Sequence, residues 1–125
     1  MASATRVGVV TGLPLVKAVE GHFDEVPFFL TSDMFGGLPV EIAGGEISSL
    51  VDKPVASTHS HRVDEIYLLL SPSPGGAVID VTAGGETVEV VSPAAVHIPA
   101  GTEHQFVTRR AERGSYCLGI LLSGR

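Results

Sequence analysis

Side chains that could bind a metal ion are concentrated in one short stretch of the sequence, residues 58–67. His59 and His61 lie two residues apart, and residues at this spacing point to the same face of a β-strand. Their imidazoles would then stand side by side as a pair of ligands. Glu65 would add a carboxylate if residues Arg62–Asp64 form a turn, because the neighbouring strand would then bring Glu65 back beside the two histidines. This pattern predicts three ligands of one metal ion.

His104 is the candidate for a fourth ligand. It follows Pro99-Ala100-Gly101, where proline and glycine predict a turn that starts a new strand with His104 at its head. Three imidazoles and one carboxylate suit Fe(II), Mn(II), Ni(II), Co(II) or Zn(II) better than Mg(II) or Ca(II), which prefer oxygen ligands. We therefore expect one divalent transition metal with one or two open positions, which chemistry requires.

Short β-strands are predicted along most of the chain. Fifteen glycines and eight prolines separate runs that are rich in Val, Ile and Leu. Turn signals spaced by roughly 8–12 residues are typical of an all-β barrel or sandwich. The glycine pairs at 36–37, 44–45 and 84–85 predict turns, the last of them in a tight hairpin over Ala83–Glu86. The expected strands are 40–42, 46–51, 65–70, 77–82, 86–91, 95–98, 105–108 and 116–122.

Taken together, the two histidine-containing segments resemble a known protein family. An isolated HxH pair is more often a surface pair than a ligand set. Here HxHxxxE, which starts at His59, is followed by PxGxxH, which starts at Pro99, within a run of short strands. In this combination the sequence resembles the cupin superfamily, over roughly residues 40–122. The resemblance implies a double-stranded β-helix, or jelly-roll barrel, that holds the metal through His59, His61, Glu65 and His104.

We expect a single domain over residues 1–125, with an N-terminal arm at residues 1–35 and a barrel core at residues 36–122. The arm is the least strand-like part of the chain, but it holds four of the five phenylalanines. Such side chains must be buried against the barrel or a second subunit, so we expect a homodimer. His22, within the arm, is expected to be exposed.

Three further residues lie close to the predicted site or in the barrel wall. Tyr67 shares the parity of Glu65, so we expect it to point into the barrel, where both are candidate catalytic residues. The alternative for Tyr67 is a core side chain with a satisfied hydroxyl. His97 is expected on the barrel wall with a structural hydrogen bond, and Cys117 as a small buried hydrophobic residue rather than a nucleophile.

The distribution of charge restricts the partners. The net charge of −6 and the pI near 5.2 argue against binding to nucleic acid or to an anionic membrane surface. No Lys or Arg lies between Arg62 and Arg109, which disfavours a phosphorylated substrate. We expect a mainly apolar cavity for a small, oxygenated organic molecule. The single cysteine suits a cytoplasmic protein, and no apolar stretch approaches the length of a membrane span.

The resemblance to small cupins implies a metal-dependent enzyme, with dioxygenase-type oxidoreduction as the favoured activity. One alternative is a lyase, cyclase (polyketide-cyclase-like) or isomerase in which the metal acts as a Lewis acid and Glu65 or Tyr67 moves a proton. The other alternative is a non-catalytic small-molecule-binding cupin. The residues leave these three functions open.

Overall fold

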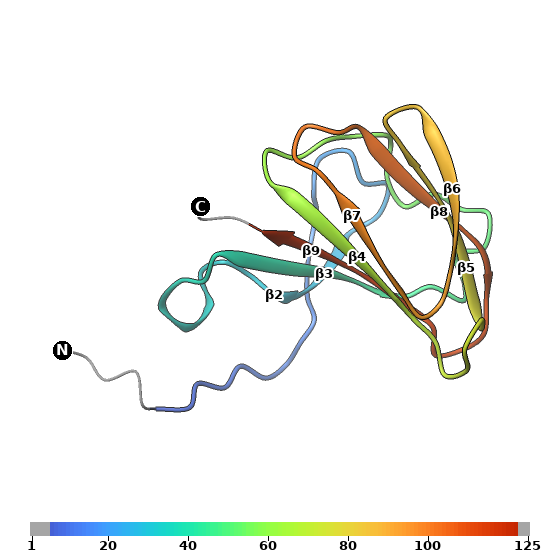
Figure 1. The fold of residues 1–125 in the computed structure, drawn as a ribbon. Coiled ribbons are helices and arrows are strands. Elements are labelled where there is room, and N and C mark those ends of the chain that lie inside the picture. Colours follow the sequence, from blue (N-terminus) through green and yellow to red (C-terminus); the bar gives the residue numbers. More distant parts are fainter. Residues whose placement is uncertain (1–5, 123–125) are drawn as a thin grey trace.

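Two antiparallel β-sheets face each other in the computed structural model, which describes residues 6–122 (Figure 1). The strands are β1 (Leu15–Lys17), β2 (Val26–Leu30), β3 (Val40–Glu46), β4 (Asp64–Leu70), β5 (Ala77–Ala83), β6 (Glu86–Val91), β7 (Ala94–Ile98), β8 (His104–Ala111) and β9 (Tyr116–Leu122), with the 3-10 helix η1 (Met34–Gly36) after β2. Within these residues one sheet has the order β1-β2-β3-β9-β4-β7 and the other β6-β5-β8. The all-β jelly-roll prediction is confirmed. No helix among the described residues is long and apolar enough to cross a membrane.

Most of the expected strands coincide with observed ones. The expected strands at 86–91 and 116–122 are β6 and β9, and those at 65–70, 77–82, 95–98 and 105–108 lie within β4, β5, β7 and β8. Ala83 pairs with Glu86 across two glycines that both have positive φ, 60° at Gly84 and 86° at Gly85. The tight hairpin is therefore confirmed, because glycine adopts positive φ without steric cost.

The prediction of a turn at residues 44–45 is wrong, and so is the strand expected at 46–51. Both glycines lie inside β3, which continues to Glu46. A Cβ at Gly44 would lie 2.2 Å from the carbonyl oxygen of Cys117 on β9, and the φ of Gly44 is 133°. Glycine is present here because the backbone of β9 comes so close, not because the chain turns. The turn comes later, where the N–H of Leu50 donates to the carbonyl oxygen of Ile47 at 2.9 Å.

The inward face of β4 leads from the apolar core to a polar site. Glu65, Tyr67 and Leu69 alternate with less buried neighbours, as the two-residue period of a strand requires. Leu69 is fully buried in the cluster between the sheets, together with Ile79 from β5. Burial of a leucine side chain stabilises the fold by roughly 1.5–3 kcal/mol. This cluster holds β4 rigidly in place at one end and presents Tyr67 and Glu65 at the other.

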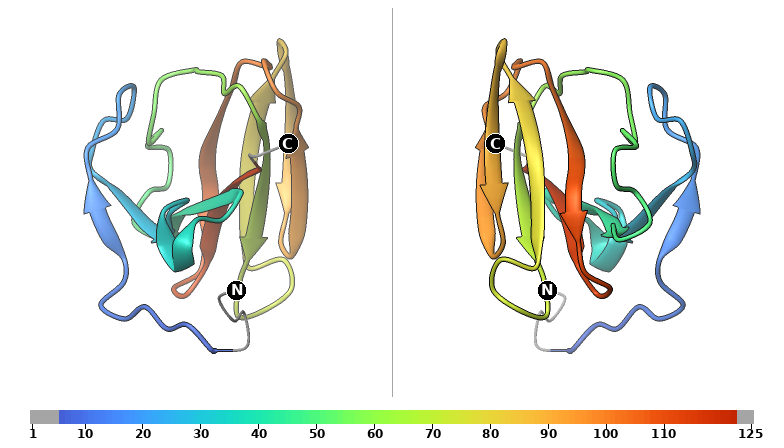
Figure 2. Two further views of the ribbon diagram at one scale, coloured as in Figure 1. Left: turned by 90° about the vertical axis from the view of Figure 1, so that its left-hand side faces the viewer. Right: turned by 90° about the vertical axis from the view of Figure 1, so that its right-hand side faces the viewer.

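The N-terminal segment forms part of the larger sheet. It supplies β1 and β2, which continue the larger sheet by antiparallel pairing with β3. The loop between β1 and β2 lies beside the long connection that precedes β4 (Figure 2). Two backbone hydrogen bonds hold them together: Phe23 N–H to the Val55 oxygen at 3.0 Å, and Ser57 N–H to the Gly21 oxygen at 2.9 Å. Residues 19–28 therefore build one wall of the space in front of β4.

Candidate metal site and pocket

The structure brings three predicted histidines into one group. The possible ligand nitrogens of His59, His61 and His104 lie within 4.8 Å of one another. Backbone pairing explains part of this arrangement: His59 and His104 form an antiparallel bridge with N–H···O distances of 3.1 and 2.8 Å. The predicted meeting of these three residues is confirmed. His59 and His61 lie in this bridged connection before β4 rather than in a regular strand.

Glu65 approaches this group from β4. Its Oε1 lies 2.9 Å from His104 Nε2 and 3.3 Å from His61 Nε2. Among the described residues it makes ion-pair contacts with these two histidines and none with His59. The carboxylate is 8% exposed, so it faces the histidines with little water around it.

Backbone carbonyls orient two of the imidazoles. His59 Nδ1 lies 2.7 Å from the carbonyl oxygen of Ser57, and His104 Nδ1 lies 2.9 Å from that of Thr102. A carbonyl oxygen can only accept a hydrogen bond, so both Nδ1 atoms carry the proton. The Nε2 lone pairs then remain for another partner, which is how metal-binding histidines are usually arranged.

The donor atoms fit a divalent transition metal. With Nδ1 of His104 committed to a carbonyl, its Nε2 lone pair faces the Glu65 carboxylate at 2.9 Å. Two lone pairs at this distance repel unless a proton or a cation lies between them. Two ligand atoms that bind one ion at about 2.1 Å and at right angles lie about 3 Å apart. The observed separations of Glu65 Oε1 from the two nitrogens, 2.9 and 3.3 Å, agree with that value.

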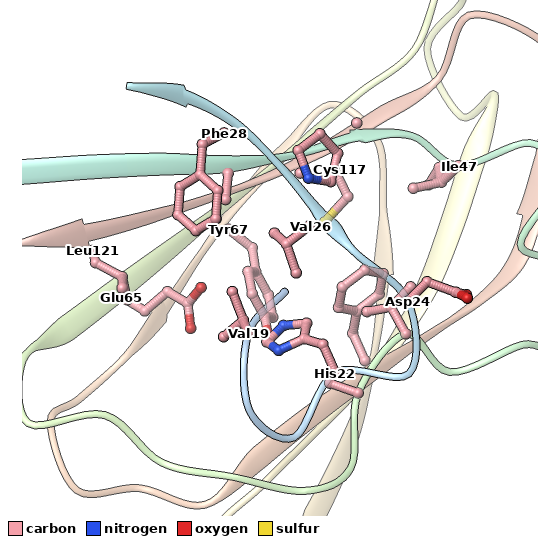
Figure 3. A pocket seen from close by; sticks show the side chains of 18 of the residues that line it. Val19, His22, Asp24, Val26, Phe28, Ile47, Glu65, Tyr67, Cys117 and Leu121 are labelled. Atoms are coloured by element: carbon pink, nitrogen blue, oxygen red, sulfur yellow. The ribbon is translucent and has the colours of Figure 1, made fainter. Parts of the chain in front are cut away.

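A cavity of about 420 Å³ opens beside the histidines (Figure 3). Its wall is mainly apolar and comes from both the barrel and the N-terminal segment. No Lys or Arg is among its lining residues in the described part of the chain. Lys17 instead places its ammonium group 4.5 Å from the ring centroid of Phe28. The apolar wall includes Val26, Phe28, Ile47, Tyr67, Phe106 and Leu121, and the carboxylates along it are Asp24, Glu25, Glu41, Glu46 and Glu65.

Solved structures resemble this chain over most of its length, although no family model and no curated protein matches the sequence. A cupin superfamily protein from Desulfitobacterium hafniense has a TM-score of 0.59 at 20% identity, over 98% of this chain and 100% of that one. A predicted oxalate decarboxylase from Thermotoga maritima has a TM-score of 0.61 at 17% identity, over 88% and 92%. KdgF from Halomonas sp. has 0.57 at 16% identity, over 88% of each chain. This chain has the cupin fold.

Electrostatic interactions in this site keep Glu65 ionised. Burial acts to raise the pKa of Glu65, but hydrogen bonds from His104 and His61 outweigh it and lower the pKa to about 2. Burial acts to lower the pKa of His104, but the hydrogen bonds to Glu65 and to the Thr102 carbonyl, together with the Glu65 charge, outweigh that effect and raise the pKa above 6.5. Burial lowers the pKa of His59, which favours the neutral ring that a metal requires. In the absence of a metal ion, a proton on His104 Nε2 takes the place of the cation between this nitrogen and the Glu65 carboxylate.

The opposite pKa shifts predict how pH affects the stability of the metal-free protein. The lowered pKa of Glu65 gives stability that is present above pH 4.5 and is lost as the pH falls toward 2. The raised pKa of His104 gives stability that is present below pH 6.5 and is lost as the pH rises through the raised value. The pair therefore stabilises the metal-free protein most between pH 4.5 and 6.5.

The thermal midpoint of EDTA-treated protein, measured between pH 3 and 9, tests this prediction against a Glu65→Gln variant. We expect the midpoint of the variant to lie furthest below that of the wild type between about pH 4.5 and 6.5, and the gap to narrow on both sides. A gap that stays constant over the whole pH range would contradict the paired titration.

Tyr67 occupies the position that its parity predicted. It is 5% exposed and lines the pocket, with its ring centroid 6.0 Å from that of His104 and 5.3 Å from that of Phe106. Burial and the Glu65 charge raise the pKa of Tyr67 far above its ordinary value of 10.0. Its hydroxyl has no hydrogen-bond partner among residues 6–122. It is therefore a fixed hydrogen-bond donor at the pocket surface rather than a proton acceptor.

Two other residues are where the sequence suggested. His97 lies outside the pocket, and its Nε2 contacts Asp64 Oδ2 at 2.9 Å, so it has the expected structural hydrogen bond on the barrel wall. Cys117 is buried in the pocket wall, and burial raises the pKa of its thiol to about 12. A thiol with this pKa is a poor nucleophile, which agrees with its predicted role as a small buried side chain.

Sequence reasoning missed the position of His22. The expectation that His22 is exposed is wrong: it is half-buried, lines the pocket and lies with its ring centroid 5.5 Å from that of His59. No local pattern around His22 indicates this, because the contact depends on the antiparallel bridge to Ala56.

Proposed function

We propose that this cupin is a metal-dependent enzyme that acts on a small, oxygenated, largely apolar organic molecule. The observation that carries the proposal is the group of His59, His61 and His104, completed by Glu65, at the wall of an apolar cavity of about 420 Å³. These four side chains would hold one divalent transition metal. A cavity of this volume lies within the usual range for small-molecule sites.

The bound metal would supply Lewis acidity and, if it is redox-active, a route for electrons between the substrate and O₂. The protein's own groups have distinct tasks. Three imidazoles and one carboxylate leave room for substrate oxygen atoms. Tyr67 donates a hydrogen bond to the substrate from a hydroxyl that stays protonated, because the pKa of Tyr67 is strongly raised. Glu65, whose pKa is lowered to about 2, stays ionised beside the reacting atoms.

The lining of the cavity supports an uncharged substrate body. Apolar side chains from β2, β4, β8 and β9 form most of the wall. No guanidinium or ammonium group among the lining residues would neutralise a phosphate or a second carboxylate. The substrate would therefore bind through one oxygenated end at the metal and pack its remaining carbon atoms against the wall.

We favour dioxygenase-type oxidoreduction, in which a redox-active metal at the histidine group acts on a substrate held against the apolar wall. A Lewis-acid lyase, cyclase or isomerase is the second candidate. It is supported by the similarity to a predicted oxalate decarboxylase, and by Tyr67, whose protonated hydroxyl can stabilise a metal-bound substrate oxygen by a hydrogen bond.

Oxygen consumption separates these candidates. Protein reconstituted with Fe(II), and separately with Mn(II), Ni(II), Co(II) or Zn(II), is incubated with a panel of small enols, diketones and hydroxyketones. We expect turnover with Fe(II) to consume O₂ in proportion to product and to stop under argon. Turnover at an undiminished rate under argon would contradict the oxygenase and support the Lewis-acid enzyme. Saturable binding without chemical change would support a non-catalytic binding protein.

We also propose that the protein is a homodimer formed through the N-terminal segment. Val7, Val9 and Phe23 are 90%, 75% and 63% exposed, and β1 is an edge strand of the larger sheet in the described part of the chain. Exposed apolar side chains beside an open edge favour pairing with a second copy. Sedimentation at micromolar concentration is expected to show a dimer, and a Val7→Ser/Val9→Ser variant a larger monomer fraction. A wild-type monomer would contradict this proposal.

A further inference from the structure

A fourth histidine, His22, belongs to the same pocket as the three grouped histidines. It comes from the loop between β1 and β2, and Figure 3 shows its ring directed into the space that Glu65 and Tyr67 also face. Its ring centroid lies 5.5 Å from that of His59. His22 is thus one of the polar side chains that the N-terminal segment contributes to the wall, together with Asp24 and Glu25.

The backbone around His22 fixes the position of the ring. The N–H of His22 donates to the carbonyl oxygen of Val19 at 3.1 Å, and His22 forms an antiparallel bridge with Ala56. The Ala56 side of this bridge belongs to the connection that leads to His59. Any movement of the His22 loop is therefore tied to the segment that carries the histidine group.

The His22 ring has an unused hydrogen-bonding atom. Its Nδ1 is buried and has no hydrogen-bond partner among the described residues. Buried polar atoms are nearly always hydrogen-bonded, so this Nδ1 lacks a partner that a ligand oxygen in the pocket would supply after a small rotation of the ring. A neutral imidazole can donate from one ring nitrogen and accept at the other, so it suits a hydroxyl or a carbonyl oxygen.

His22 lies outside the metal-binding group itself. The nitrogens that lie within 4.8 Å of one another are those of His59, His61 and His104, and His22 is not among them. Its ring is instead next to His59 alone. His22 therefore borders the pocket beside the histidine group, within reach of a molecule bound there. This position fits a contact to the ligand better than a contact to the metal.

We propose that His22 is a positioning residue that hydrogen-bonds an oxygen atom of the metal-bound substrate. This proposal rests on the proposed metal-dependent function and deepens it. The substrate would carry two neighbouring oxygen functions, as a hydroxyketone or an enolised diketone does, with one end held at the metal and His22 selecting the orientation. An apolar molecule with a single oxygen would not use this contact.

Cobalt-loaded protein and tropolone, a seven-membered hydroxyketone that chelates divalent ions through two adjacent oxygens, test this proposal. The visible spectrum of Co(II) reports the metal site, and its change on titration with tropolone gives a dissociation constant. His22→Phe keeps a ring but loses hydrogen bonding, whereas His22→Asn places an amide nitrogen near the position of Nδ1. His97→Phe is the matched control, since His97 lies outside the pocket.

We expect all four proteins to bind one equivalent of Co(II) with the same spectrum before tropolone is added. Tropolone should bind His22→Phe about 5–10-fold more weakly than wild type, and His22→Asn should recover most of the loss, as expected for one hydrogen bond. The His97→Phe protein should match the wild type. These results would support His22 as a positioning residue.

Three results would overturn the proposal, and they differ in what else they affect. Unchanged tropolone affinity in His22→Phe would reject His22 and leave the proposed metal site intact. Loss of Co(II), or an altered Co(II) spectrum, in a folded His22→Phe protein would make His22 a metal ligand instead. Wild-type protein that binds no Co(II) would reject the proposed function together with this inference.

Discussion

Replacing His59 and His104 together with alanine is expected to abolish metal binding. The double variant removes two of the three nitrogens in the histidine group and leaves Glu65 without its closest partner, which lies at 2.9 Å. Loss of even a supporting residue near a metal typically weakens binding about 10–100-fold, so loss of two ligands should exceed that range. Metal content is measured by mass spectrometry on protein purified without a histidine tag, after reconstitution and dialysis.

The wild type should retain about one equivalent of a transition metal, and the double variant close to none. His104 is 1% exposed, so its removal also leaves a cavity, and circular dichroism must show that the variant is folded. A single His59→Ala variant, at a half-buried position, provides a second measurement with less effect on packing. His97→Ala is the control for loss of a histidine elsewhere. One equivalent retained by a folded double variant would contradict the site.

A methyl group at Gly119 is expected to disable the site without removing any of its functional groups. Gly119 lies opposite Tyr67 on the neighbouring strand β9, and a Cβ there would lie 2.5 Å from Glu65 Oε2. Since real Cβ contacts are longer, Gly119→Ala must push the Glu65 carboxylate away from His61 and His104. We expect metal affinity to fall about 10–100-fold and the free energy of unfolding to fall by about 1–3 kcal/mol.

Two further variants separate displacement of Glu65 from a general effect on the sheet. Gly45→Ala on β3 is the matched control, because its Cβ would meet only Pro27 Cγ at 3.7 Å, an ordinary contact. It should keep its metal. Gly119→Ala/Glu65→Asp shortens the side chain that clashes, and should recover part of the affinity lost by Gly119→Ala alone. Unchanged metal affinity in Gly119→Ala would contradict the expected displacement of the Glu65 carboxylate from His61 and His104.

The histidine group was predictable only in part from local features, because His104 meets His59 through a bridge between segments far apart in the chain, which the resemblance to cupins implied. His59 and His61 are two residues apart. The turn before His104 contains proline and glycine, whose backbone conformations favour a turn. Strands such as β6 and β9 were likewise predictable from runs of β-branched and aliphatic residues between glycines. These features depend on a few neighbouring residues and on steric rules that hold in any fold.

The position of Gly44 shows where local reasoning fails. A glycine pair has the same appearance in sequence whether it makes a turn or admits a neighbouring strand. Only the approach of the Cys117 carbonyl from β9 shows that Gly44 serves the second purpose. The same holds for Gly119, whose missing side chain makes room for Glu65 from another strand. Contacts of this kind depend on strand order, which joins segments far apart in the chain.

The sequence by itself determined that this protein has many short strands and that three histidines and a glutamate could meet as metal ligands, because alternation and turn residues act over a few positions. Tertiary structure alone decided what surrounds them. It brought His22 from the N-terminal segment to the pocket, and directed His97 to Asp64 outside it. The local sequence around these two histidines gives little sign of their different positions. Pairing with the connection before β4 brings His22 to the pocket, whereas His97, on β7, contacts Asp64 outside it.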